Sequence, residues 1–223
     1  MTTIMGKEIK TSDLQKIVNA FEKITPKSWE IFSNSCQCIQ ISKSADGRGL
    51  STGADIDFFL TNQFLPEQMG GGFDKFHKGE ADVKIAGVPA SFKTLKSKGD
   101  TALSWSKNPT HKKDGSLSVD RKFLSDPMPM IVYVRQSSRW WKKTPNNPSS
   151  KSYTWNQVIY SGIYVVDTFK SSNFLVLKSN NKSNSIIDSK DMFRMLVDAA
   201  NDGFFVKIPE PDGRFKRMKY IFE

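Results

Sequence analysis

The sequence predicts an α/β protein in which helices flank a mixed central β-sheet. Residues 12–24 and 189–203 repeat apolar side chains at the spacing of one helix face. Residues 130–134 and 162–166 are apolar at every position, as in strands that are buried on both faces of a sheet. Residues 80–93 alternate apolar and polar side chains about a Gly/Pro turn, which is typical of a β-hairpin.

The elements follow one another along the chain as helix, helix, hairpin, strands and helix. Ser12 and Gln15 form a capping-box pattern that opens the first helix, and Pro26 stops it. A second capping-box pattern and apolar stripe predict a helix over residues 52–65. The polar residues 107–122 are typical of a long loop or a small surface hairpin.

The C-terminal half completes the predicted sheet. Residues 174–177 resemble the two buried strands in their apolar composition, and residues 204–208 are a candidate for a further strand. The final helix begins at Ser189 and ends at Gly203, because glycine is favoured just past a helix C-terminus. We expect the 223 residues to form a single domain.

The charge of the chain predicts a nucleic-acid partner. There are 33 lysines and arginines against 23 acidic residues, a formal net charge of +10. A phosphate polymer is the natural counterpart of such a surface. A membrane is the competing partner for basic charge, but no long uncharged apolar run predicts a span. The N-terminus lacks the layout of a secretion signal, which predicts a cytoplasmic protein, and Cys36 and Cys38 are expected to be reduced and partly buried.

The hairpin concentrates ionisable side chains on one face. A four-residue loop from Ala86 to Pro89, favoured because proline lacks an N–H, would place Asp82 opposite Lys93. Side chains alternate between faces along a strand. One face then holds the apolar side chains Val83, Ile85, Ala90 and Phe92, and the other holds Glu80, Asp82, Lys84, Ser91 and Lys93.

The acidic pair on this face predicts a divalent cation. Glu80 and Asp82 are two positions apart, about 6.6 Å along a strand. Their mutual repulsion is on the order of 2 to 3 kcal/mol at an effective dielectric constant of 20. A cation or a nearby lysine would relieve this repulsion, and carboxylate oxygens are hard ligands that suit Mg²⁺.

Asp82 and the triplet Ser91-Phe92-Lys93 resemble the motif of the PD-(D/E)XK nucleases, which include most type II restriction endonucleases. That family places an aspartate on one strand and an (Asp/Glu)-x-Lys triplet on the antiparallel neighbour. The resemblance implies that Asp82 and the Phe92 carbonyl bind Mg²⁺ and that Lys93 orients or activates the attacking water. It also implies a restriction-endonuclease-like core for the α/β fold.

Ser91 departs from the family pattern because it stands where the triplet has its acid. Some members of the family take the second carboxylate from another position. Glu80, on the same predicted hairpin face, is favoured, and Asp57 is next, with Asp55 and Asp100 as further candidates. The alternative for Asp57 is an ordinary first-turn acid that complements the helix dipole.

Two basic and aromatic loops are predicted to contact DNA, around residues 94–122 and 135–153. Arginine and glutamine can read base edges, lysines can hold phosphates, and tryptophans can stack on bases or wedge between them. The alternative for the tryptophans is that they anchor loops or cap the core. The candidate DNA-binding residues are Lys96, Lys98, Trp105, Lys107, Arg135, Gln136, Arg139, Trp140, Trp141, Lys142 and Lys143.

These observations, with the resemblance, predict a Mg²⁺-dependent type II restriction endonuclease that hydrolyses double-stranded DNA at a specific site. By analogy with such enzymes, it is expected to work as a homodimer. One alternative is a repair or structure-specific nuclease of the same superfamily. The other is a non-catalytic DNA- or RNA-binding protein whose acidic hairpin is incidental.

Overall fold

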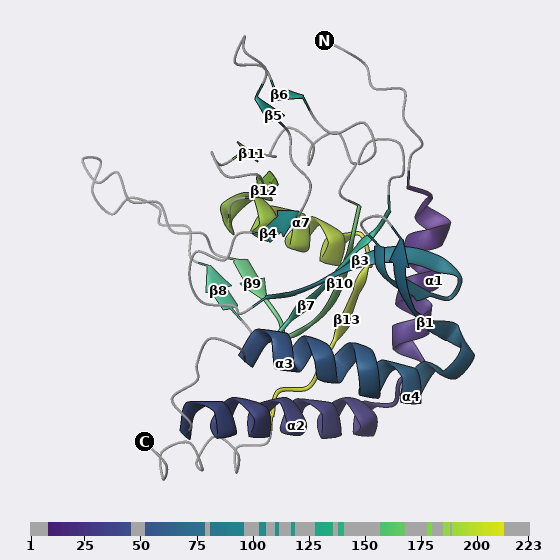
Figure 1. Ribbon diagram of the computed structural model, residues 1–223, viewed down its shortest axis with the longest axis vertical. Coiled ribbons are helices and arrows are strands. Elements are labelled where there is room, and N and C mark those ends of the chain that lie inside the picture. The colour runs from purple at the N-terminus through teal and green to yellow at the C-terminus, as the bar shows by residue number, and fades with distance from the viewer. Residues whose placement is uncertain are drawn as a thin grey trace, which may run out of the picture.

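A computed structural model gives the arrangement of the sheet and of the helices around it (Figure 1). The residues that it describes are 9–45, 52–78, 81–95, 103–105, 110–111, 117–118, 128–135, 138–140, 157–167, 178–179, 185–187 and 189–211. Within these ranges, no helix is both long enough and apolar enough to cross a bilayer. The predicted strand over 174–177 lies outside them.

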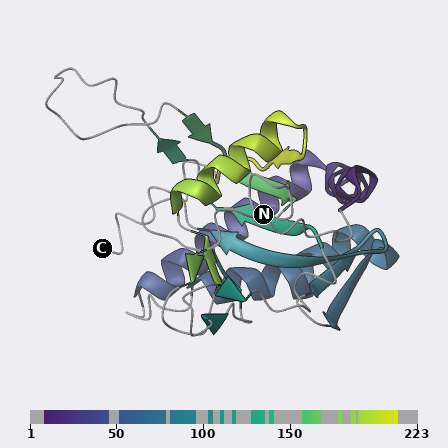
Figure 2. The same cartoon turned by 90° about the horizontal axis from the view of Figure 1, so that it is seen from above.

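Six strands form the central sheet in the order β1-β2-β3-β7-β10-β13. Their bounds are β1 Phe73–Lys78, β2 Ala81–Ile85, β3 Val88–Leu95, β7 Met130–Val134, β10 Gly162–Val166 and β13 Phe205–Lys207. β3 and β7 run parallel, and the other neighbouring pairs are antiparallel. The predicted mixed sheet is therefore confirmed, and β3 crosses the middle of the molecule (Figure 2).

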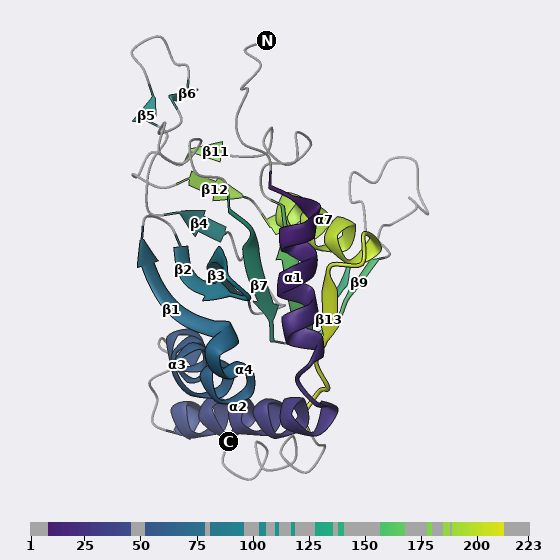
Figure 3. The ribbon, with the colours of Figure 1, turned by 90° about the vertical axis from the view of Figure 1, so that its right-hand side faces the viewer.

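Helices flank both faces of this sheet, as the sequence predicted. They are α1 Thr11–Glu22, α2 Pro26–Ala45, α3 Thr52–Phe59, the π-helical turn η1 Leu60–Phe64, α4 Leu65–Met69, the 3₁₀ turn η2 Gly70–Gly72 and α7 Ser189–Asn201. α2 and α3 lie on one side of the sheet and α7 on the other (Figure 1). α1 runs lengthwise beside the sheet (Figure 3).

Short strands outside the central sheet pair among themselves. β4 Leu103–Trp105, β11 Lys178–Ser179 and β12 Ser185–Ile187 form a three-stranded sheet. β5 Thr110–His111 pairs with β6 Leu117–Ser118, and β8 Ser138–Trp140 pairs with β9 Gln157–Ile159. The β5–β6 pair lies within residues 107–122, where the sequence predicted a long loop or a small hairpin.

The two faces of the sheet pack into separate apolar clusters, which explains the uniformly apolar strands. In β7, Ile131 and Tyr133 pack with α1, α2 and α3, whereas Met130, Val132 and Val134 pack with α7. Successive side chains of a strand point to opposite faces. A strand that is covered on both faces must therefore be apolar at every position, as predicted from the sequence.

The first helix begins differently from the sequence prediction and is followed at once by another. Lys10 is the N-cap residue of α1, and Ser12 lies inside its first turn. Pro26 ends α1 as predicted, but it also opens α2, because proline is well suited to the first helical position. The Oγ1 atom of Thr25 accepts a hydrogen bond from the Ser28 N–H at 3.1 Å and caps this second helix.

The hairpin turn is shorter than the sequence predicted. Ile85 pairs with Val88, so the loop is the two-residue turn Ala86-Gly87, and both residues have positive φ angles (49° and 80°), as a type I′ turn requires. The predicted four-residue loop is wrong because Pro89 pairs with Lys84 inside the ladder. An antiparallel ladder alternates bonded and non-bonded pairs, so the side of Pro89 that lacks an N–H faces away from β2.

Gly162 is a position where any side chain would clash. A Cβ atom built there would lie 2.4 Å from the Phe205 Cε2 atom and 2.4 Å from the Val206 carbonyl oxygen. We predict that Gly162→Ala lowers the free energy of unfolding by about 1–3 kcal/mol, measured by urea denaturation, because the β10–β13 pair would have to shift. Gly71→Ala is the matched control, since no heavy atom lies within 4 Å of its added Cβ. Equal losses in the two variants would contradict the packing account.

Candidate active site

The candidate active site lies where β2 and β3 stop pairing with each other. The ladder joins Val83–Ile85 to Val88–Ala90, and from Ser91 onward β3 pairs with β7 on its other side. The Ser91 N–H donates to the Pro129 carbonyl at 3.0 Å. Because backbone groups alternate in direction along a strand, the N–H of Phe92 points to the β2 side, where the ladder has ended.

The carboxylate of Asp82 takes the place of the missing ladder bond. Its Oδ2 atom accepts a hydrogen bond from the Phe92 N–H at 2.8 Å and one from the Ser91 Oγ at 3.1 Å. Neither bond uses the other carboxylate oxygen, Oδ1. Ser91 itself is 3% exposed, so its hydroxyl is a buried donor that this carboxylate satisfies.

Asp82 and Lys93 share one face of the sheet. Val83 and Ile85 of β2, and Ala90 and Phe92 of β3, pack into the cluster beneath α1, α2 and α3. Alternation then places Asp82, Ser91 and Lys93 on the opposite face. The predicted partition of faces is confirmed for the described residues, and Glu80 lies outside them. The predicted pairing is wrong: the shorter turn moves the register by two residues, so Asp82 lies beside Ser91 and not opposite Lys93.

Asp57 approaches the same region from the face covered by α1, α2 and α3. Its Oδ1 atom accepts a hydrogen bond from the Thr94 hydroxyl, and its backbone carbonyl accepts one from the Thr61 Oγ1 at 2.7 Å. Thr61 belongs to the π-helical turn η1, which directly follows α3. π-helical turns are frequent at functional sites. The helix therefore presents Asp57 to β3, which a plain first-turn acid would not require.

Asp57 is affected by burial and by charges from Arg135, Lys93 and Asp82. Burial raises the pKa of this carboxyl from 3.8 to about 6, while the positive charges of Arg135 and Lys93 lower it and the negative charge of Asp82 raises it. Asp57 is thus within electrostatic reach of both Asp82 and Lys93. Among the alternative acids, Glu80 and Asp100 lie outside the described residues.

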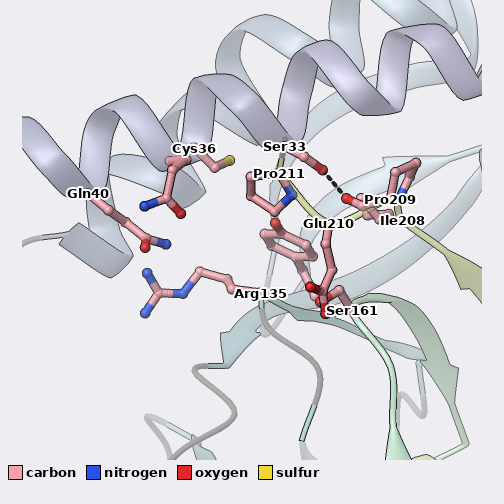
Figure 4. Close-up of a pocket in the computed structure, with 11 residues that line it drawn as sticks. Ser33, Cys36, Gln40, Arg135, Ser161, Ile208, Pro209, Glu210 and Pro211 are labelled. Atoms are coloured by element: carbon pink, nitrogen blue, oxygen red, sulfur yellow. Dashed lines mark hydrogen bonds between the residues drawn. The ribbon is translucent and has the colours of Figure 1, made fainter. Parts of the chain in front are cut away.

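Arg135 leaves β7 at the rim of this region, and it faces α2. Its backbone N–H donates to the Leu95 carbonyl at 3.0 Å. Its side chain lines a pocket with Cys36 and Tyr133 (Figure 4). Burial raises the pKa of the Cys36 thiol to about 12 although Tyr133 and Arg135 favour the thiolate, so this cysteine is protonated at neutral pH. Both cysteines are free, as expected, but Cys38 is exposed.

For the other predicted DNA-binding residues, the structure gives at most the position of the backbone. Trp105 lies at the end of β4, and Arg139 and Trp140 lie in β8. The remaining candidates lie outside the described residues, and they are Lys96, Lys98, Lys107, Gln136, Trp141, Lys142 and Lys143. Their contact with DNA stays a prediction.

Comparisons with known proteins give one distant likeness. No protein-family model matches the chain, and no curated protein matches it in sequence. A solved structure of a restriction endonuclease in complex with substrate DNA is similar, with 15% sequence identity and a TM-score of 0.39. The match covers 82% of this chain and 81% of that one. At this identity and TM-score, the likeness carries no weight for function.

Asp57 should make the stability of the protein depend on pH. The folded pKa of about 6 lies above the ordinary 3.8, so the folded protein holds a proton that the unfolded chain releases between these values. The free energy of unfolding should therefore fall as the pH rises from about 4 to 7, by on the order of 1–2 kcal/mol for a half-buried group. Urea denaturation at several pH values measures this fall.

The variant Asp57→Asn should lose this pH dependence, because its amide does not titrate and still accepts the Thr94 hydrogen bond. Asp74→Asn, at an exposed position of β1, is the control and should keep the dependence of the unmodified protein. An unchanged pH profile in Asp57→Asn would show that another group is responsible.

Proposed function

We propose that this protein is a Mg²⁺-dependent endonuclease that hydrolyses double-stranded DNA at a specific site, in the manner of a type II restriction enzyme. One observation carries the proposal: the Asp82 carboxylate is fixed against the start of the Ser91-Phe92-Lys93 segment, and Lys93 shares its face of the sheet. This is the pairing of acid and lysine that the PD-(D/E)XK resemblance implies.

The oxygen atoms around Asp82 suit a hard cation. Both hydrogen bonds to this carboxylate end on Oδ2, which leaves Oδ1 as the oxygen that would bind Mg²⁺. The carbonyl of Phe92 points to the same side as its N–H, toward Asp82, and would be a second oxygen ligand. Mg²⁺ is bound by one or two carboxylates together with water and substrate phosphate oxygens. Bound there, it would draw negative charge from the scissile phosphate and acidify a water molecule.

The second carboxylate remains a choice between Asp57 and Glu80. Asp57 interacts electrostatically with Asp82 and Lys93, and burial already disfavours its ionised form. A cation beside it would lower its pKa and relieve that cost. In this scheme the Lys93 ammonium orients the attacking water and stabilises the charge that develops on the phosphate oxygens.

The rest of the molecule supports DNA as the substrate through charge. The net charge of +10 would favour a phosphate polymer, and the basic sequence segments 94–122 and 135–153 begin at the ends of β3 and β7. A dimer with two-fold symmetry would match a palindromic target. We expect binding to weaken steeply as the salt concentration rises.

A non-catalytic nucleic-acid-binding protein is the second candidate. Across the described parts of the chain, no group of three or more His, Cys, Asp or Glu side chains is close enough together to hold a metal ion. Ser91 also lacks the carboxylate of the nuclease triplet. On this alternative, Asp82 serves only to satisfy the Phe92 N–H and the Ser91 hydroxyl.

A plasmid cleavage assay separates the two candidates. We predict Mg²⁺-dependent cutting that falls about 100-fold or more in Asp82→Asn and in Lys93→Ala, with duplex binding retained in the absence of metal. The asparagine keeps an oxygen that can accept the Phe92 and Ser91 hydrogen bonds, so the fold should survive. Lys84→Ala removes a cation from the same face of β2 and is the control. Mg²⁺-independent binding without any cutting would support the non-catalytic alternative.

The product pattern tests site specificity. Discrete fragments would support a restriction enzyme, whereas a smear, or a preference for branched duplexes, would support another nuclease of the same kind. Comparing Asp57→Asn with Glu80→Gln identifies the second acid, because only the variant that loses a ligand should need a higher Mg²⁺ concentration for half-maximal cutting.

Restoring the acid at position 91 gives a test that does not depend on activity. In Ser91→Asp, two carboxylates would lie about 4 Å apart, with a repulsion of about 4 kcal/mol at an effective dielectric constant of 20. We predict a lowered Tm without metal and a larger rise of Tm with Mg²⁺ than in the unmodified protein, measured by thermal denaturation. Ser91→Asn is the uncharged control, and an equal Mg²⁺ effect in all three proteins would contradict a cation at Asp82.

A further inference from the structure

The pocket between α2, the end of β7 and the C-terminal segment 208–211 contains a cation without a counter-ion. Within the described residues, the guanidinium of Arg135 makes no hydrogen bond or ion pair, and its Nε atom is buried without a partner. A guanidinium offers five N–H donors and no acceptor. Buried polar groups are normally hydrogen-bonded, and buried charges are normally paired. The Nε–H of Arg135 therefore has no acceptor among the described residues.

The surroundings of Arg135 are polar and have room for a ligand. The cavity has a volume of about 220 Å³, and its lining includes Cys36, Gln40, Tyr133, Arg135, Ser161 and Glu210. About seven water molecules occupy that volume in liquid water, and binding sites for drug-sized ligands are larger. The ligand that fits is a single small group.

The charges in the pocket indicate which kind of group would bind there. Burial lowers the pKa of Arg135, while Tyr133, Asp57 and Cys36 act to raise it. The hydrogen bond of the Asp57 side chain goes to Thr94, on the β3 side. In Figure 4 the Arg135 guanidinium is turned toward Gln40, whereas the Glu210 carboxylate is turned toward Ser161. The two charged ends of the pocket are thus separated. The end formed by Arg135 offers N–H donors to an anion, and the arginine fork matches the geometry of phosphate.

We propose that this pocket binds a phosphate group through the guanidinium of Arg135, at a site separate from the Asp82–Lys93 face. The phosphate belongs either to a small phosphate compound or to the DNA. In both cases Arg135 would donate to the phosphate oxygens from beneath α2. The site does not depend on the proposed cleavage, because Tyr133 and Arg135 face the side of the sheet covered by α1, α2 and α3, whereas Lys93 faces the side of α7.

Titration with inorganic phosphate, with a nucleoside 5′-monophosphate and with a short duplex tests the proposal. Binding is followed by calorimetry without Mg²⁺ and with ionic strength held constant with chloride. We expect saturable binding by the unmodified protein and at least a 10-fold loss of affinity in Arg135→Gln. Lys27→Gln removes an exposed cation from the same helix, α2, and should bind as the unmodified protein does.

A second variant covers the case in which Arg135→Gln fails to fold. Gln37 is half-buried in the pocket wall, so Gln37→Trp would fill the cavity and leave Arg135 in place. It should lose phosphate binding to a similar extent. Saturable binding of the two small compounds would identify a small-molecule site, and an Arg135 effect on the duplex alone would identify a DNA phosphate. If each ligand binds to all four proteins with the same affinity, or if no ligand binds saturably, the proposal is overturned.

Discussion

The candidate site depends on one hydrogen bond, from the Phe92 N–H to the Asp82 carboxylate. β2 and β3 separate after Val83 and Ala90, and a strand edge that loses its partner must satisfy its backbone donors in another way. The side chain of Asp82 does so at 2.8 Å and holds the acid against β3. The Phe92 carbonyl points to the same side of the strand as its N–H and therefore also faces the acid. The geometry that suits a cation is thus a consequence of how the sheet opens.

The face covered by α1, α2 and α3 carries a second set of polar groups around the same strands. Thr94 of β3 and Tyr133 of β7 are register partners, and Arg135 lies two residues after Tyr133, just past the end of β7. Asp57 bonds to Thr94 from α3, and Cys36 meets Tyr133 from α2. Asp57 therefore stands between the Asp82–Lys93 face and the Arg135 pocket. Its raised pKa is the electrostatic sign of a carboxylate that is buried without a full counter-charge.

Sequence patterns predicted the parts of this structure that depend on local periodicity. The apolar runs over 130–134 and 162–166, the terminal helix and the two faces of the hairpin were all predicted, because each depends on a spacing that a single segment carries. The length of the hairpin turn was not predicted correctly. A proline is tolerated inside a strand at positions where the ladder needs no N–H donor, and Pro89 occupies such a position. β1 was missed because its sequence, Phe73 to Lys78, is mostly polar, as an edge strand can be.

The residues that other helices and strands contribute to the site could not be predicted from the sequence. Asp57 was identified only as one acid among several, because its position beside β3 is set by how α3 packs on the sheet. The sequence of α2 has no pattern that indicates a pocket. Arg135 follows a strand within a basic and aromatic segment, so the sequence analysis assigned it to DNA binding. Packing between segments that are distant in the sequence brings these side chains together, and residue spacing within one segment does not predict such contacts.

The central claim is that Asp82 and the Phe92 carbonyl hold a divalent cation beside Lys93. Crystals grown with Mn²⁺ in place of Mg²⁺ test it most directly, through the anomalous scattering of the metal. The account predicts a peak about 2–2.3 Å from an Asp82 carboxylate oxygen, with the Phe92 carbonyl as a further ligand. No peak beside Asp82 at saturating Mn²⁺, with Lys93 instead paired to that carboxylate, would contradict it.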